Sequence, residues 1–262
     1  MIREVCSLGR AEFDRPHTDG GDPDAARLLV RGLRAVGPDG PPSDISPSLD
    51  LLAPRAPYFD RLVLDAVTAG VPQVVDPGAG YDDRALRFRT PGVEFFDLDL
   101  PDVIADKARR LEATDTAHLT LVAVDFGTDD VAEVLARAGH DADRPTLFIA
   151  EHLVLFLEPD DVERLITATS GRAAPGSTLA ITAETHPTAL DSDLVVSAVD
   201  ELMFGGAGPL RTIRARDAWL ALFDKAGWRV EDADEVTAVD HFELPVSGEV
   251  VGIRTQFLTA TA

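Results

Sequence analysis

The sequence contains a single cysteine, Cys6, which excludes an internal disulfide and a zinc site built from cysteines. It also lacks any long apolar run. The most apolar stretch, residues 146–157, is interrupted by Glu151 and His152 and is too short to span a bilayer, which takes ~20 residues. No apolar run near the N-terminus has the length that a signal peptide needs. We therefore expect a cytoplasmic protein that does not insert into a membrane.

Lysine is nearly absent, with only Lys107 and Lys225, and 46 acidic residues stand against 24 basic ones. The formal net charge of −22 repels the phosphates of nucleic acids and anionic membrane surfaces. The chain is therefore not expected to bind either of them. Little lysine together with much alanine, arginine, aspartate and glycine is also typical of a GC-rich genome, so the acidity by itself does not indicate a function.

The order of the predicted elements indicates an α/β fold. Two helices are expected first, at 22–36 and 57–69. From residue 73 on, short apolar runs alternate with amphipathic segments, which is the pattern of a parallel sheet covered by helices on both faces. The expected strands are 73–77, 93–99, 119–125, 146–151 and 177–184. The expected helices between them begin at Asp82 and span 101–113, 129–138 and 159–172.

The segment after the fifth strand, 185–211, is polar and rich in glycine, and we expect an insertion there. A helix and two β-rich stretches close the chain, at 216–226, 228–240 and 250–258. The sequence thus predicts a doubly wound, mostly parallel, seven-stranded sheet in one domain, 1–262. Its expected parts are an N-terminal helical cap, a ligand-binding core, a lid and a C-terminal part: 1–70, 71–184, 185–215 and 216–262. The cap and the lid would cover the carboxyl edge of the sheet, where ligands bind in such folds.

Gly78 and Gly80 follow the first strand and allow a sharp turn that a ligand can approach closely. Such a turn is a weak signal, because many are merely tight turns. A dinucleotide fingerprint would have a third glycine near position 83, where this chain has Asp82 and Asp83. Two carboxylates at a helix start oppose a phosphate and tolerate a cationic ligand without phosphates. S-adenosylmethionine, with its sulfonium and ammonium, is such a ligand.

Acidic residues recur at the ends of the next three strands. Asp99 lies 19 residues after Gly80, where a carboxylate can accept hydrogen bonds from both hydroxyls of a ribose; alternatively, it caps the helix at Pro101. Asp125 with Phe126 ends the third strand and suits an adenine, and Glu151 ends the fourth. Any one of these acids could be a helix cap. Their gathering at one edge with the glycine turn favours a ligand site.

Four segments, "QVVDPGAGYDDRALRF", "EFFDLDLPDVIADKARRL", "VAVDF" and "RPTLFIAEHLVLFLEPDDVERLI", resemble the leucine carboxyl methyltransferase family and its bacterial small-molecule relatives, including polyketide O-methyltransferases. The resemblance is clear over roughly 54–176. It implies a Rossmann-like class I methyltransferase fold with S-adenosylmethionine as cofactor. The cofactor contacts that it implies are Arg55, Gly78, Asp99, Asp125, Phe126 and Glu151, with Arg55 holding the cofactor's carboxylate; Gly80 is expected to contact the cofactor as part of the glycine turn.

The chain departs from the family pattern before the glycine turn, where Asp76–Pro77 replaces the usual apolar pair. Asp76 corresponds to the acidic residue of the wider methyltransferase superfamily and is expected to face the cofactor's ammonium, or else it marks a changed loop. Arg55 in turn could be a surface arginine at a helix start. The N-terminal segment also lacks the usual family pattern.

Methyl transfer places few demands on acid–base groups when the acceptor is a carboxylate, which is already ionised at neutral pH. A phenol or enol would benefit from a base. His152 and His186 follow strands four and five and are the candidate bases, although each could be structural. On a carboxylate acceptor, replacing either histidine by alanine should leave activity within about tenfold. Three arginines of the insertion, Arg211, Arg214 and Arg216, could neutralise a substrate anion or form a solvated face.

We therefore expect an S-adenosylmethionine-dependent O-methyltransferase acting on a carboxylate or acidic hydroxyl of a small molecule, such as a polyketide or other secondary metabolite. No metal is expected, and a homodimer is left open. One alternative keeps the cofactor without methyl transfer: a cyclase or lyase on a methyltransferase fold. Another is a nicotinamide-dependent dehydrogenase, which Asp82 and Asp83 disfavour.

Overall fold

The computed structural model describes residues 55–112, 114–187, 190–204, 206, 208–231, 239–246 and 249–262. The helix expected at 22–36 lies outside this part of the chain, as does most of the expected N-terminal cap. Within the described residues, no helix is both long enough and apolar enough to cross a membrane.

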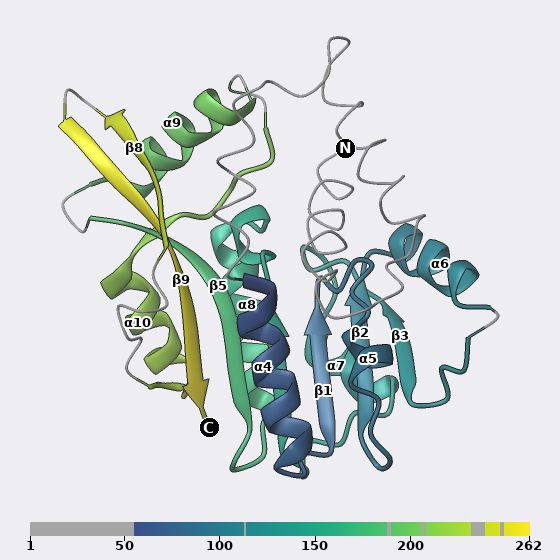
Figure 1. Cartoon of the computed structure of the whole chain (residues 1–262). Coiled ribbons are helices and arrows are strands. Elements are labelled where there is room, and N and C mark those ends of the chain that lie inside the picture. Colours follow the sequence, from purple (N-terminus) through teal and green to yellow (C-terminus); the bar gives the residue numbers. More distant parts are fainter. Residues whose placement is uncertain are drawn as a thin grey trace.

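A nine-stranded sheet forms the centre of the molecule (Figure 1). Seven strands follow the order β3-β2-β1-β4-β5-β9-β7, and β6 and β8 pair with β5 and β9 outside this path. The first five strands are parallel to their neighbours, and β9 runs antiparallel to β5. The strands are β1 Gln73–Pro77, β2 Glu94–Asp99, β3 Leu119–Ala123, β4 Thr146–Ala150, β5 Thr178–His186, β6 Arg214–Ala215, β7 Arg229–Val230, β8 Val239–Val246 and β9 Glu249–Thr261. The doubly wound, mostly parallel sheet is confirmed; the strand order reverses between β1 and β4, where such folds bind ligands.

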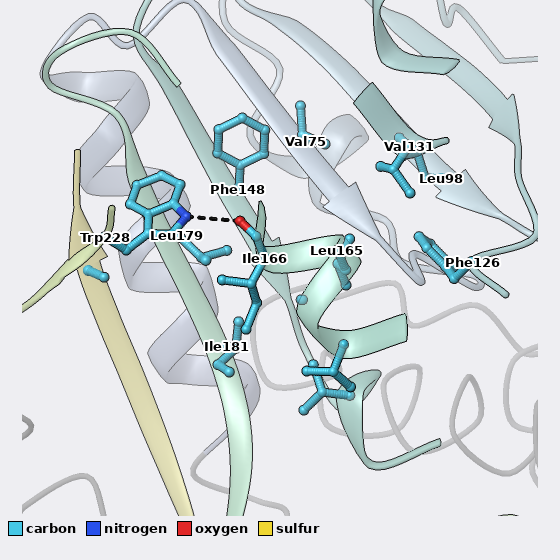
Figure 2. Packing of buried hydrophobic residues seen from close by; sticks show 14 of the residues in the cluster. Val75, Leu98, Phe126, Val131, Phe148, Leu165, Ile166, Leu179, Ile181 and Trp228 are labelled. Carbon is cyan, nitrogen blue, oxygen red and sulfur yellow. Dashed lines mark hydrogen bonds between the residues drawn. The ribbon is translucent and has the colours of Figure 1, made fainter. Parts of the chain in front are cut away.

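Side chains of the central strands alternate between two apolar layers, as the period of a strand requires. Val75, Phe96 and Phe148 lie in one cluster, together with α8 and α10 residues. Their chain neighbours Val74, Phe95 and Leu147 lie in the other, together with α4 residues. Figure 2 shows the first cluster, in which the indole of Trp228 donates to the carbonyl of Ile166 at 3.2 Å. Burial on both faces explains why these strands read as continuous apolar runs.

The helices of the described chain are α4 Arg55–Thr68, α5 Arg84–Arg87, α6 Pro101–Arg110, α7 Val131–Arg137, α8 Pro159–Gly171, α9 Ser192–Phe204 and α10 Arg216–Lys225, with a 3₁₀ turn, η2, at Val154–Phe156. Pro101 and Pro159 occupy first-turn positions, which the fixed φ of proline favours. Asp130 caps α7 by accepting a hydrogen bond from the N–H of Glu133.

Helix α9 corrects the sequence expectation of a polar, glycine-rich segment over 185–211. Its buried residues Val195 and Val199, one helical turn apart, pack in a third apolar cluster with Leu210, Ile213 and Ile253. The apolar residues of α9 are present in its own sequence, so the expectation was wrong in treating this stretch as part of a polar, glycine-rich insertion. α9 lies beyond the upper end of β5, on the side where the parallel strands end (Figure 1).

Candidate active site

The turn after β1 is fixed against the end of β2. Gly78 and Gly80 have φ values of +72° and +50°, a backbone region that glycine adopts without strain. The N–H groups of Gly78 and Ala79 donate to the carbonyl of Leu98 at 2.8 and 3.0 Å. A β-carbon added to Gly78 would lie 2.9 Å from Cδ1 of Leu153. The turn therefore requires glycine at position 78 for both its conformation and its packing.

Asp99 is held by the glycine turn. Its Oδ2 accepts from the N–H of Gly80 at 2.7 Å, and its Oδ1 accepts from the N–H of Leu100 at 2.7 Å. The N-cap of α6 is Leu100, which has no side-chain cap, so the alternative of Asp99 as the helix cap is wrong. A carboxylate has about four lone-pair sites. Asp99 is only partly buried and keeps acceptor capacity for further hydroxyl donors.

Asp76 is buried, with 3% of its surface exposed, and its Cα pairs with that of Asp97 in the β1–β2 register. The ammonium of Lys107 in α6 donates to the carboxylate of Asp97 at 2.6 Å and balances its charge. The same ammonium donates to the carbonyl of Asp82 at 2.8 Å. Lys107 thus ties α6 to the loop that follows the glycine turn. The sequence analysis did not identify this pair, because lysine and aspartate ten residues apart carry no local signature.

Arg84, 1% exposed, links three elements around the site. Its Nε donates to Asp60 of α4 at 2.6 Å, and its Nη1 donates to Asp82 at 2.5 Å and to Glu151, next to β4, at 2.7 Å. Glu151 itself is 2% exposed, so its predicted cofactor contact would be made from within this network. Arg55 begins α4, but its side chain lies outside the described part of the structure.

The same network corrects one argument made from the sequence. Asp82 pairs with Arg84, and Asp83 pairs with Arg87 at 2.7 Å. The helix there, α5, has only four residues. The two carboxylates therefore do not act as unbalanced charges against a phosphate, and the argument that they disfavour a dinucleotide is wrong.

Asp125 and Phe126, which follow β3, lie in different surroundings. Asp125 is exposed, and its Oδ1 accepts from the N–H of Gly127 at 2.9 Å. Phe126 is 6% exposed and packs in the first apolar cluster near Val131 (Figure 2). Asp125 thus lies at the open edge of the sheet, whereas the ring of Phe126 contributes to the core.

His152 has a φ of +55°, and no other non-glycine residue in the described ranges has a positive φ. Its N–H donates to Oγ1 of Thr182 at 3.2 Å, and its ring lies edge-on to Phe156 at 5.3 Å. Its Nδ1 lies 3.9 Å from Oε1 of Glu184 on β5. Glu184, which the sequence analysis did not select, is 5% exposed. The structure therefore brings an acidic partner to this candidate base.

His186 is held on both sides of its ring. A carbonyl oxygen only accepts, so Nδ1 donates to the carbonyl of Pro187 at 2.8 Å. The other nitrogen, Nε2, accepts from the hydroxyl of Ser192 at 2.9 Å, at the start of α9. Both ring nitrogens are engaged in holding the segment between β5 and α9. The two candidate bases therefore differ in their surroundings: His186 contacts a carbonyl and a hydroxyl, whereas His152 faces the carboxylate of Glu184.

The arginines of the insertion are engaged with their neighbours. Arg211 pairs with Glu158 at 2.9 Å. Arg214 donates to the carbonyl of Pro159 at 2.9 Å and lies over the ring of Trp219. Arg216 is exposed at the start of α10. These contacts favour the solvated, structural alternative over an anion site.

Known proteins resemble this chain in sequence and in fold. The model of the leucine carboxyl methyltransferase family matches residues 39–170. Two relatives are provisionally named S-adenosyl-L-methionine-dependent methyltransferases. One, from Mycolicibacterium gilvum, is 41% identical over 56% of this chain and 48% of its own length. The other, from Parafrankia sp., is 32% identical over 80% of this chain and 67% of its own length. The chain spans about half the length of most curated relatives it resembles.

A crystal structure from Thermobifida fusca, described as that of a methyltransferase, superimposes with a TM-score of 0.59. The superposition covers 98% of this chain and 95% of that one, at 18% sequence identity. At this identity the likeness supports the fold alone.

Proposed function

Because the chain belongs to the leucine carboxyl methyltransferase family, we propose that it is an S-adenosylmethionine-dependent O-methyltransferase. The proposed substrate is a small molecule, such as a polyketide or other secondary metabolite, that offers a carboxylate or an acidic hydroxyl. Catalysis in the cytoplasm and assembly as a homodimer belong to the same proposal.

The observation that carries the proposal is the contact between the glycine turn and Asp99. The N–H of Gly80 orients the Asp99 carboxylate at 2.7 Å, at the edge where the strand order reverses. A carboxylate fixed in this way suits the two hydroxyls of a ribose. The site fits a cationic nucleoside ligand, because Asp76 and Asp125 flank the same edge.

When bound, S-adenosylmethionine supplies a methyl group on a positively charged sulfur. The residues of the chain would hold and align the two reactants, which is the main protein contribution to an in-line displacement. Asp99 would accept from the ribose, Asp76 would face the ammonium, and Asp125 would accept from the adenine. Arg55 at the start of α4 would hold the carboxylate, while Arg84 fixes α4 against the loop and β4.

The proposal is tested by two measurements on the purified protein. Calorimetry with S-adenosylhomocysteine should show binding, and a screen of small acids and phenols with methyl-labelled S-adenosylmethionine should give a labelled product. Cofactor binding without any methylated product, but with conversion of an acceptor, would favour a cyclase or lyase instead. A protein that does not bind S-adenosylhomocysteine would overturn the proposal.

A further inference from the structure

The backbone at His152 is held in an unfavourable conformation. A positive φ is unfavourable for a non-glycine residue, and such strain persists only where the surroundings impose it. Two neighbours do so here: Thr182 accepts from the backbone N–H of His152, and Phe156 packs against the ring. The ring is also largely enclosed, with 17% of the side chain exposed. The chain therefore aims this imidazole in one direction at a cost in stability.

The carboxylate of Glu184 faces Nδ1 of that ring at a distance longer than a hydrogen bond, so it acts on the ring through its charge. Its carboxylate oxygen lies 3.9 Å from Nδ1, and its side chain is 6% exposed. A buried carboxylate facing Nδ1 favours the tautomer with the hydrogen on that atom. The lone pair is then on Nε2, which becomes the atom able to take up a proton. A carboxylate also stabilises the imidazolium that forms.

His152 lies beside the proposed cofactor site. The next residue, Leu153, contacts the glycine turn so closely that a β-carbon on Gly78 would meet it at 2.9 Å. His152 therefore directly precedes the residue that packs on the turn against which the cofactor would lie.

We propose that the acceptor is a hydroxyl that is un-ionised at neutral pH, such as a phenol or an enol, and that His152 takes its proton while Glu184 positions the imidazole. This inference rests on the proposed function and narrows its substrate class. The acceptor oxygen forms a bond to the methyl carbon as the carbon–sulfur bond breaks. The electron pair of that bond stays on sulfur, and the hydroxyl proton moves to Nε2 of His152. Nothing is oxidised or reduced.

A carboxylate acceptor would not need His152 as a base, because it is already ionised when it binds. The sequence alone favoured a carboxylate or an equally acidic hydroxyl, since neither histidine had a sequence neighbour to orient it. Glu184 supplies that neighbour from β5, 32 residues further along the chain. The proposed role of His152 therefore departs from the expectation that its loss would leave activity within about tenfold.

The first test needs no acceptor. Nitrogen-15 NMR of the imidazoles, with His152 assigned by its loss in His152→Asn, should show hydrogen on Nδ1 and an unprotonated Nε2 at neutral pH. In Glu184→Gln the two tautomers should mix. A His152 ring with hydrogen on Nε2, or one unaffected by Glu184→Gln, would overturn the positioning role of Glu184.

The second test measures turnover of graded phenols and of the matching benzoates. Asparagine tolerates a positive φ, so His152→Asn should preserve the backbone. We expect kcat on phenols to fall at least about 100-fold in His152→Asn, with little change in KM. Glu184→Gln should lower kcat by a smaller factor, which Glu184→Asp should partly restore. The control is His118→Asn, at the opposite edge of the sheet, where the ring contacts the carbonyl of Ala85.

The outcomes separate the two proposals. A wild-type protein that does not bind S-adenosylhomocysteine defeats the proposed function. A wild-type protein that binds it but methylates benzoates in preference to phenols, or a His152→Asn variant within tenfold of wild type on phenols, defeats only the role of His152. If neither phenols nor benzoates are turned over, the NMR measurement of the His152 tautomer decides whether the proposed role of His152 and Glu184 stands.

Discussion

A single side chain, that of Asp99, accepts hydrogen bonds from two backbone N–H groups. One oxygen fixes the glycine turn through Gly80, and the other accepts from Leu100. The same carboxylate is the proposed ribose acceptor. Structural and binding roles therefore overlap in this residue, and a substitution that separates them is informative. Asparagine can still accept a hydrogen bond from Gly80 but lacks the charge and half of the acceptor capacity.

Asp99→Asn should therefore weaken S-adenosylhomocysteine binding by about 1–3 kcal/mol, because hydrogen bonds to a charged acceptor are lost. Calorimetry measures the change. The matched control is Asp115→Asn, an exposed aspartate that pairs with Arg89 away from the site. Equal affinity in a folded Asp99→Asn protein would remove the ribose role.

Gly78 is constrained by both its backbone and its neighbours. Gly78→Ala should be destabilised by roughly 1–2 kcal/mol of backbone strain and by a further 1–3 kcal/mol from the close approach to Leu153. Denaturant unfolding measures the sum. Gly92 has a similar φ of +84° with no atom within 4 Å of an added β-carbon, so Gly92→Ala reports the strain alone. Equal losses at the two positions would show that Leu153 yields without cost.

Three elements meet at the buried guanidinium of Arg84, which connects α4, the loop after the glycine turn and the end of β4. Removing one partner from a buried ionic network leaves its counter-charges uncompensated. Arg84→Met should therefore cost about 3–5 kcal/mol of unfolding free energy.

Chemical denaturation tests this against Arg61→Met on the same helix. Arg61 pairs with Asp65, but both side chains are mostly exposed, so that change should stay within about 1 kcal/mol. A loss of similar size in both variants would show that the buried network contributes nothing particular to stability.

His140 joins α7, β4 and α8. Arg172 only donates, so Nδ1 of His140 accepts from it, and Nε2 therefore donates to Thr146 at 2.9 Å. Burial and the Arg172 charge lower the pKa of His140 from 6.5 to about 4. Between these values the unfolded chain binds more protons than the folded one, so stability falls as the pH drops from about 6.5 to about 4.

Between pH 6.5 and pH 4 the unfolding free energy should fall by about 3 kcal/mol in total. Above pH 6.5 the contribution of His140 should be almost fully retained. Urea unfolding at a series of pH values measures it. His140→Gln should be less stable at neutral pH but should show a flatter profile between pH 6.5 and 4. A variant whose profile parallels that of wild type would assign the acid sensitivity to other groups.

Much of the sheet could be predicted from the sequence, because each strand and the helix that follows it have their own local pattern of apolar residues. β1, β2 and β4 lie within a residue of their expected bounds, and prolines mark the starts of α6 and α8. The contacts that depend on tertiary structure were not predictable. Glu184 meets His152, and Arg84 meets Asp60, only because neighbouring strands and α4 converge at one edge. Helix α9 was missed for another reason, since its apolar residues, Val195 and Val199 among them, are visible in the sequence and were read as part of a polar insertion.

For the whole molecule, the deciding feature is that the strand order reverses between β1 and β4. Because these strands are parallel, the glycine turn after β1, Asp99 at the end of β2 and His152 after β4 lie at one edge, around the point of reversal. A ligand that bridges these elements is bound by the folded chain and not by the unfolded one. Its binding free energy must then appear as stability of the entire fold.

S-adenosylhomocysteine should accordingly raise the unfolding free energy by about 2.7 kcal/mol at one hundred times its Kd. For a chain of this size that corresponds to an increase in Tm of roughly 5–10 °C. NAD is the informative comparison ligand, because Asp82 and Asp83 are paired with arginines and do not by themselves exclude it. It is added at about one hundred times a Kd typical of dinucleotides. Scanning calorimetry with each ligand, on wild type and Asp99→Asn, measures both shifts. A shift with S-adenosylhomocysteine that shrinks in Asp99→Asn, and none with NAD, is the expected result; stabilisation by NAD alone would return the chain to the dehydrogenase alternative.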